Sequence, residues 1–154
     1  MAIAYRIIDS FNLLHHLKRS QIKDIFHDIA TMIAAIETYA VNRGEVCQFV
    51  FDGIRFEDQY ESTHTSQMHF SEPGQTGDEL MERLMNLMPE ESRRFSTLVT
   101  DDRCLTDMAL GMGVRHERCE IFMRSMTHKS YLKDDDDKPN YANKPFNNPF
   151  NDLG

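Results

Sequence analysis

The sequence lacks long apolar runs, cysteine pairs with metal-binding spacing and an excess of basic residues. No stretch approaches the roughly 18 consecutive apolar residues that a membrane span needs, so we expect no membrane association. The first residues lack a basic segment followed by a long apolar core, and no secretory signal is expected. The three cysteines, Cys47, Cys104 and Cys119, form no CxxC motif, which argues against a zinc site and a disulfide framework. Together these absences favour a reducing, cytoplasmic setting.

The charge excludes a broad basic surface. The formal net charge is −8, and residues 1–133, with 15 basic and 20 acidic side chains, carry −5 of it. Proteins that grip duplex nucleic acid through many phosphates are usually basic. A local nuclease site is still compatible with this balance, because bound divalent metals offset clustered carboxylates.

The length predicts one domain, residues 1–132, and a tail, residues 133–154, whose acidic start and Asn/Pro/Phe-rich remainder are typical of disorder. Apolar runs predict strands that end at Asp9 and span residues 46–51, 68–70 and 95–100, with a brief last strand at Val114. Apolar spacing predicts helices over residues 22–42, 77–88, 103–112 and 117–132. Residues 13–20 are expected to form a loop or short helix, and residues 53–66 a long surface loop. Strands alternating with helices indicate an α/β fold with a parallel sheet.

The helix over residues 77–88 has a clear start signal. Thr76 and Glu79, three residues apart, have the form of a capping box. Leu80, Leu84 and Leu87 are expected to form the apolar face of this helix.

Acidic residues stand at the predicted strand ends and helix starts: Asp9, Asp52, Asp78 with Glu79, and Asp101 with Asp102. In a parallel sheet the carboxyl ends of the strands and the starts of the following helices lie at one edge. We therefore expect carboxylates from at least three distant segments to meet in one crevice. Like charges held together are costly unless a cation neutralises them, and Mg²⁺ prefers oxygen ligands of this kind.

Each acid also has an ordinary structural explanation. Asp9 and Asp52 fit turns that end strands. Asp78 is favoured at a helix start by the helix dipole, and either Asp101 or Asp102 suits the N-cap of the next helix. These explanations do not account for all the acids falling on one edge, and the joint pattern favours metal-assisted attack of water on a phosphodiester. The sequence contains no GxSxG, GxxxxGK[ST], HExxH or GxGxxG motif that would indicate another chemistry.

Four blocks of the sequence resemble the NYN-domain nucleases, a PIN-like family. Residues 8–13 (IDSFNL) are similar to the family's DGYNL opening, with Ser10 in place of Gly, and residues 49–53 (FVFDG) match its second strand. Residues 70–83 resemble the F…TADE.IE block, with Gly77 in place of Ala. Residues 99–114 follow the VTSDR…L…A…GV pattern. The resemblance covers roughly residues 5–125 and is closest to a bacterial subgroup that includes a ribosome-associated, mRNA-cleaving endonuclease.

The resemblance implies a three-layer α/β PIN-like (NYN) fold with a sheet of four to five parallel strands. It also implies metal ligation, by Mg²⁺ or Mn²⁺, at Asp9, Asp78 and Asp102. Asn12 would bind a metal-bound water or the scissile phosphate, Thr100 would orient its neighbours, and Asp52 would be an accessory ligand. Asp101 stands where the family has Ser or Asn, so it either reaches the metal through water or caps a helix.

The sequence thus predicts an endoribonuclease that cleaves RNA (mRNA, rRNA or tRNA) to 5′-phosphate and 3′-hydroxyl ends, with the ribosome as a candidate partner. The candidate phosphate contacts, each of which also fits an ordinary surface charge, are Lys18, Arg19, Arg55 and Arg103. One alternative is a catalytically inactive RNA- or protein-binding module of the same fold. A phosphoacceptor domain is disfavoured because no lysine stands at the end of a late strand. A phosphatase is disfavoured because Phe11 stands where Asp-x-Asp would place its second acid. The oligomeric state is not predicted.

Overall fold

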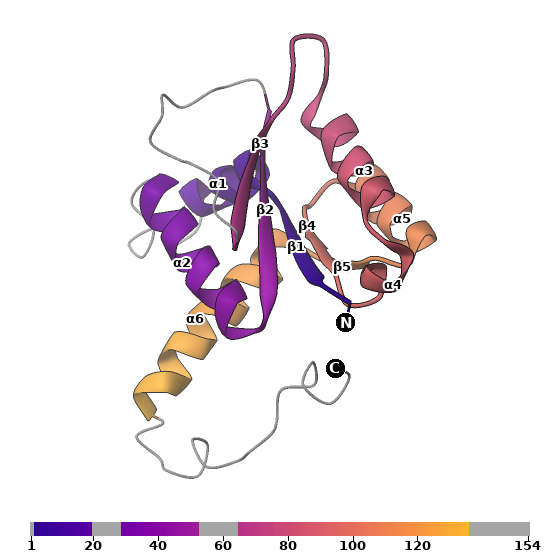
Figure 1. Cartoon of the computed structure of the whole chain (residues 1–154). Helices are drawn as coiled ribbons and strands as arrows, with labels where there is room; N and C mark the ends of the chain where they lie inside the picture. Colours follow the sequence, from indigo (N-terminus) through magenta and orange to yellow (C-terminus); the bar gives the residue numbers. More distant parts are fainter. Residues whose placement is uncertain (1, 20–28, 53–64, 136–154) are drawn as a thin grey trace.

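A computed structural model describes residues 2–19, 29–52 and 65–135, whose strands form one parallel sheet (Figure 1). The strands are β1 (Ala4–Asp9), β2 (Glu45–Phe51), β3 (Ser66–Phe70), β4 (Thr97–Val99) and β5 (Arg115–Glu117). Their order is β3-β2-β1-β4-β5, and every neighbouring pair is parallel. The predicted α/β fold with a parallel sheet of four to five strands is confirmed.

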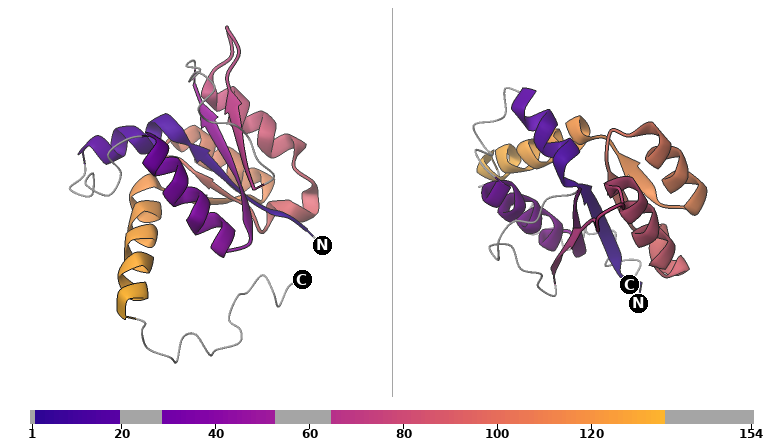
Figure 2. Two further views of the ribbon diagram at one scale, coloured as in Figure 1. Left: turned by 60° about the vertical axis from the view of Figure 1, so that its left-hand side comes forward. Right: turned by 90° about the horizontal axis from the view of Figure 1, so that it is seen from above.

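The helices cover both faces of the sheet and complete a three-layer arrangement (Figures 1 and 2). One face carries α1 (Ser10–Arg19), α2 (Ile29–Asn42) and α6 (Cys119–Asp135), and the other carries α3 (Gly77–Leu87), α4 (Glu90–Arg93) and α5 (Arg103–Met112). None of the helices described is both long and apolar enough to cross a membrane.

Strand β1 lies at the point where the winding of the sheet reverses. From β1 the chain proceeds outward through β2 to β3, and it then returns to the other side of β1 to form β4 and β5. Open α/β sheets bind ligands outside the strand carboxyl ends at such a point. The fold therefore places the end of β1, at Asp9, beside the end of β4 in the crevice where a functional site is expected.

The alternation of side chains along β1 divides the core between the two layers. Ile8 is fully buried with Phe49, Met32 and Phe122 on the α2/α6 face. Its neighbour Ile7 packs on the α3/α5 face, in the cluster that includes Met85 and Leu98. Asp9, two residues beyond Ile7, consequently belongs to the α3/α5 face.

The predicted apolar face of helix α3 is only partly correct, because Leu80 and Leu84 are half-buried against the α3/α5 core whereas Leu87 is exposed. Leu87 is 70% exposed, and the buried side chains of this helix are Met81 and Met85. The leucines and the methionines both recur at helical spacing, so periodicity alone could not choose between them. Packing against β1, β2 and α5 selects the methionine side.

Other boundaries differ in detail from the prediction. Helix α1 begins at Ser10, directly after Asp9, where a loop or short helix was expected from residue 13. The short helix α4 was not predicted, and the final strand follows Val114 at Arg115–Glu117. The expectations for residues 20–28, for most of the 53–66 loop and for the tail beyond residue 135 lie outside the described residues.

A buried arginine joins three elements on the α2/α6 face. The Arg6 guanidinium donates two hydrogen bonds to the Glu45 carboxylate, at 2.8 and 3.0 Å, and one to Glu117 at 2.8 Å. The rings of Tyr39 and Phe122 lie 5.4 and 5.1 Å from it. Burial opposes the charge, but the hydrogen bonds and negative charges of Glu45 and Glu117 outweigh burial and raise the pKa of Arg6.

We predict that Arg6→Met lowers the free energy of unfolding by about 3–5 kcal/mol, because it leaves the Glu45 carboxylate buried without its partner. Urea unfolding measures the change. Arg124→Met is the control, since Arg124 pairs with Glu120 on the exposed face of α6, and such pairs contribute only about 0.3–0.5 kcal/mol. Equal losses in the two variants would contradict the role given to burial.

Candidate active site

Asp9 ends β1 and is held by two hydrogen bonds. Thr100 Oγ1, at the end of β4, donates a hydrogen bond to Asp9 Oδ2 at 2.8 Å. The backbone N–H of Asn12 donates to Asp9 Oδ1 at 3.3 Å. Burial is the main cause that raises the pKa of Asp9 to about 6, and the negative charges of Asp78 and Asp102 raise it further. The two hydrogen bonds lower this pKa but do not cancel the rise. The negative charges of Asp78 and Asp102 therefore reach Asp9, so the three predicted metal ligands lie near one another.

Asp102 begins helix α5 and is tied to the same threonine. Its amide donates to Thr100 Oγ1 at 3.1 Å, and its Oδ1 accepts from the Leu105 amide at 3.1 Å as the N-cap of the helix. The N-cap explanation is thus correct for Asp102, and it is compatible with a second role. Capping directs the Asp102 carboxylate toward the start of α5, at the edge of the sheet where Asp9 lies.

Asp78 approaches from the start of α3. The predicted capping box is present, since Thr76 Oγ1 accepts from the Glu79 amide at 3.1 Å and the Glu79 carboxylate accepts from the Thr76 amide at 3.4 Å. The pKa of Asp78 is raised mainly by its partial burial. The nearby carboxyl of Asp102 and then the negative charge of Asp52 raise it further. The neighbouring carboxylates thus disfavour the ionised form of Asp78.

Asp52 lies directly beyond β2 and against the start of α3. Ser71 Oγ, after β3, donates to Asp52 Oδ1 at 3.0 Å. A Cβ placed on Gly77 would lie 3.1 Å from Asp52 Cβ, so the absence of a side chain allows this close approach. Gly77, which stands where the family has Ala, therefore brings the first turn of α3 against Asp52.

Asp101 and Asn12 are engaged in contacts with other elements. Asp101 Oδ1 accepts from the Cys119 amide at 2.9 Å, at the start of α6, and its Oδ2 lies 3.9 Å from His16 Nδ1. Asn12 Oδ1 accepts from the Asp101 amide at 2.8 Å and from Cys119 Sγ at 3.2 Å. The side-chain oxygen of Asn12 therefore already accepts two hydrogen bonds from within the protein. Asp101 stabilises the start of α6.

Of the four predicted phosphate contacts, Arg103 is the one whose side chain the structure describes. Arg103 is exposed as the first residue of α5, next to Asp102. Lys18 and Arg19 lie in the last turn of α1, where only the backbone is described, and Arg55 lies outside the described residues. Ser10 occupies the first position of α1, so it needs no left-handed backbone there.

Sequence reasoning missed two polar side chains near this edge. Ser71 follows β3 directly, and the rule that located Asp9 and Asp52 at strand ends also applies to it. His116 Nε2 lies 2.8 Å from the Thr100 carbonyl oxygen and 2.9 Å from Thr106 Oγ1. No local signal in the sequence marks His116, because its partners lie on β4 and α5.

The donor set suits a hard divalent cation, although it is not assembled as a finished metal site. Its oxygens come from Asp9, Asp78 and Asp102, and the pKa values of Asp9 and Asp78 are raised in part by the neighbouring carboxylates. A divalent cation would relieve that repulsion. Among the described residues, however, no group of three or more His, Cys, Asp or Glu side chains is arranged to hold a metal ion. The chemistry of the donors fits Mg²⁺ or Mn²⁺.

Comparison with known proteins identifies what the chain is similar to. Residues 5–149 match the family described as the YacP-like NYN domain. The structure is similar to a crystal structure of Rae1 (YacP) from Bacillus subtilis, with a TM-score of 0.66 and 15% identity over 93% of this chain and 84% of that one. A tryptophan-to-leucine variant of the same protein gives 0.63 and 14%, over 93% and 87%. No curated protein matches the sequence.

We predict that the metal-free protein loses stability as the pH rises from about 4 to about 6, because the pKa of Asp9 is raised from 3.8 to about 6 on folding. The folded state then binds the Asp9 proton more tightly than the unfolded state does, so ionisation favours unfolding. The shift corresponds to at most about 3 kcal/mol. Urea unfolding in EDTA should show this loss in the wild type and in Asp107→Asn, an exposed control on α5, and a smaller loss in Asp9→Asn. Identical pH dependence in all three would contradict the assignment.

We also predict that Asp101→Ala lowers the free energy of unfolding by about 1 kcal/mol, the usual cost of removing a helix cap. The cause is the loss of its hydrogen bond to the first amide of α6. Glu120→Ala, an exposed acid in the first turn of the same helix, is the matched control and should change stability less. If the two variants have equal stability, Asp101 does not anchor α6.

Proposed function

The chain belongs to the YacP-like NYN domain family, and from this premise we propose that it is a divalent-metal-dependent endoribonuclease. The family and the structural neighbours give the chain a nuclease-type fold. The observation that carries the proposal is the meeting of Asp9, Asp78 and Asp102, from three distant segments, at the switch point between β1 and β4. The three carboxylates are within range of mutual repulsion and have no basic partner in any described ion pair.

The proposed roles follow from the contacts. Asp9, Asp78 and Asp102 would hold Mg²⁺ or Mn²⁺, which would supply charge neutralisation and a more acidic water for attack on the phosphodiester. Thr100 keeps Asp9 and Asp102 together, because its hydroxyl donates to one and accepts from the amide of the other. Asp52 is an accessory acid at the same edge, positioned by Ser71 and by the close approach of Gly77.

Asn12 and Asp101 receive different roles under this proposal. Because Asn12 Oδ1 already accepts two hydrogen bonds, only its amide N–H groups remain to contact a phosphate oxygen or a water. Asp101 acts mainly by anchoring α6. Of these two adjacent acids, Asp102 would hold the metal ion, whereas Asp101 would stabilise the start of α6.

The proposed substrate is single-stranded RNA, since a crevice lined by acids accepts a flexible strand more readily than a rigid duplex of high charge. Cleavage would leave 5′-phosphate and 3′-hydroxyl ends. Arg103, exposed beside Asp102, is the described cation best placed for a phosphate. With so few basic groups, affinity would depend on a partner such as the ribosome, and the protein would act in the cytoplasm.

The test is cleavage of an end-labelled RNA with Mn²⁺ or Mg²⁺, with and without ribosomes. Asp102→Asn and Asp78→Asn should each lower activity more than about 100-fold, beyond the 10–100-fold effect typical of groups that only support a metal ligand. Asp107→Asn, on the exposed face of α5, is the matched control and should retain activity. Equal activity in all variants, or a wild type that is inert under every condition, would sink the catalytic assignment and favour the inactive binding module.

A further inference from the structure

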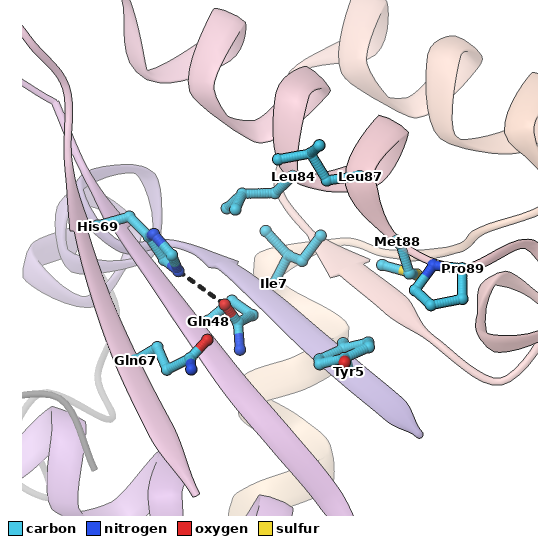
Figure 3. Close-up of a pocket in the computed structure, with 9 residues that line it drawn as sticks. All are labelled: Tyr5, Ile7, Gln48, Gln67, His69, Leu84, Leu87, Met88 and Pro89. Atoms are coloured by element: carbon cyan, nitrogen blue, oxygen red, sulfur yellow. Dashed lines mark hydrogen bonds between the residues drawn. The ribbon is translucent and has the colours of Figure 1, made fainter. Parts of the chain in front are cut away.

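A cavity of about 180 Å³ lies on the α3/α5 side of the sheet, between β1, β2 and β3 and the C-terminal half of α3 (Figure 3). Its floor is formed by side chains of the three strands, among them Ile7, Gln48 and His69. Leu84, Leu87 and Met88 form the wall on the helix side. None of the candidate metal ligands lines this cavity, so it is distinct from the acidic edge.

The cavity and the acidic edge are two parts of the same sheet face. Side chains two residues apart on a strand share a face, which places Ile7 below Asp9 and Gln48 below Asp52. The strand register aligns Asp9 with Val50, and Val50 with His69. At about 3.3 Å per residue, Ile7 lies about 7 Å and Tyr5 about 13 Å from Asp9 along β1. A strand of nucleic acid bound at the acids would therefore reach the cavity within one or two nucleotides.

Gln48 supplies an unsatisfied hydrogen-bond donor in this cavity. Its side chain is only 6% exposed, and its Oε1 lies 2.7 Å from His69 Nε2. Burial lowers the pKa of His69, so the ring is neutral and donates its N–H to Gln48 Oε1. Gln48 Nε2 has no hydrogen-bond partner among the described residues, and Figure 3 shows it turned from His69 toward the space between Gln67 and Tyr5. Leaving a buried donor unpaired costs free energy, which a ligand with an acceptor atom would recover.

The other lining groups fit a flat, uncharged ring. Tyr5 provides an aromatic face, and Leu87, at 70% exposure, provides an apolar rim that the core does not use. The volume is below the roughly 300–1,000 Å³ of sites for drug-sized ligands, so it suits one ring system. No lysine or arginine is present among the described lining residues, which disfavours a phosphate. A nucleobase combines stacking faces with acceptor atoms on its edge.

We propose that this cavity, the base pocket, receives one unpaired nucleobase of the RNA strand whose scissile phosphate lies at the acidic edge. This inference rests on the proposed function. The base stacks beside Tyr5 and Leu87, and an acceptor on its edge binds Gln48 Nε2. The base pocket would thus position the strand and give cleavage a base preference on one side of the cut.

Binding is tested in the catalytically blocked Asp102→Asn background, with a short fluorescent single-stranded RNA followed by anisotropy. Gln48→Leu should weaken binding about three- to tenfold, the value of one hydrogen bond. Its melting temperature should change little, because the substitution removes an unsatisfied buried donor but also the acceptor of the His69 N–H. Asn86→Leu, which removes an exposed amide from α3, is the control and should bind like the parent.

A second pair of variants tests the apolar rim without altering the core. Leu87→Ala should also weaken RNA binding severalfold, whereas Leu110→Ala, on α5 and 63% exposed, should not. In the active protein, cleavage of a randomised RNA should show a base preference one or two nucleotides from the cut, and Gln48→Leu should reduce it.

The outcomes separate this proposal from the proposed function. If the wild type cleaves RNA but Gln48→Leu and Leu87→Ala retain its affinity and base preference, the base pocket is refuted and the nuclease remains. If Leu110→Ala loses as much affinity as Leu87→Ala, the effect is not specific to the pocket and the proposal also fails. An absence of both RNA binding and cleavage in the wild type refutes both.

Discussion

The hydroxyl of Thr100 is the contact on which the candidate site depends. It donates to Asp9 at 2.8 Å and accepts from the Asp102 amide at 3.1 Å, so one side chain joins the end of β1 to the start of α5. Two acids 93 positions apart in the sequence are thereby fixed side by side despite their repulsion. The raised pKa of Asp9 records the cost of that arrangement, through burial first and neighbouring charge second. Carboxylates with perturbed pKa values of this kind cluster at functional sites.

The two faces of the sheet differ in whether their charged side chains form ion pairs. On the α2/α6 face, Arg6 is buried and fully paired with Glu45 and Glu117, and it consolidates β1, β2 and β5. On the α3/α5 face, carboxylates gather at the edge with no described arginine or lysine paired to Asp9, Asp78 or Asp102. An acidic domain thus uses a buried cation for stability and leaves its functional edge uncompensated. In a chain of net charge −8, the acidic residues at this edge are therefore free of the ion pairs that hold Arg6.

Helix α3 links the acidic edge with the base pocket. Its first turn brings Asp78 to the edge because Gly77 permits close contact with Asp52. Its later turns bury Met81 and Met85 and leave Leu84 and Leu87 beside the uncovered parts of β2 and β3. A single helix therefore sets both the position of a candidate metal ligand and the wall of the cavity below it. The distance between the two follows from the rise of the neighbouring strand.

The sequence by itself determined the strand ends at Asp9 and Phe51, the capping box at Thr76 and the bounds of α5, because these depend on short-range backbone hydrogen bonds and local apolar spacing. It also placed Asp9, Asp78 and Asp102 at one edge, since parallel strands share that edge. Only the tertiary structure decided that Asp101 binds the start of α6, that α3 buries its methionines, and that Gln48 is buried with an unpaired donor. These features depend on partners from other elements, as with Asn12 and Cys119, which are 107 positions apart. No local pattern encodes which of two apolar helix faces will be buried, or which side chain will meet a partner that distant.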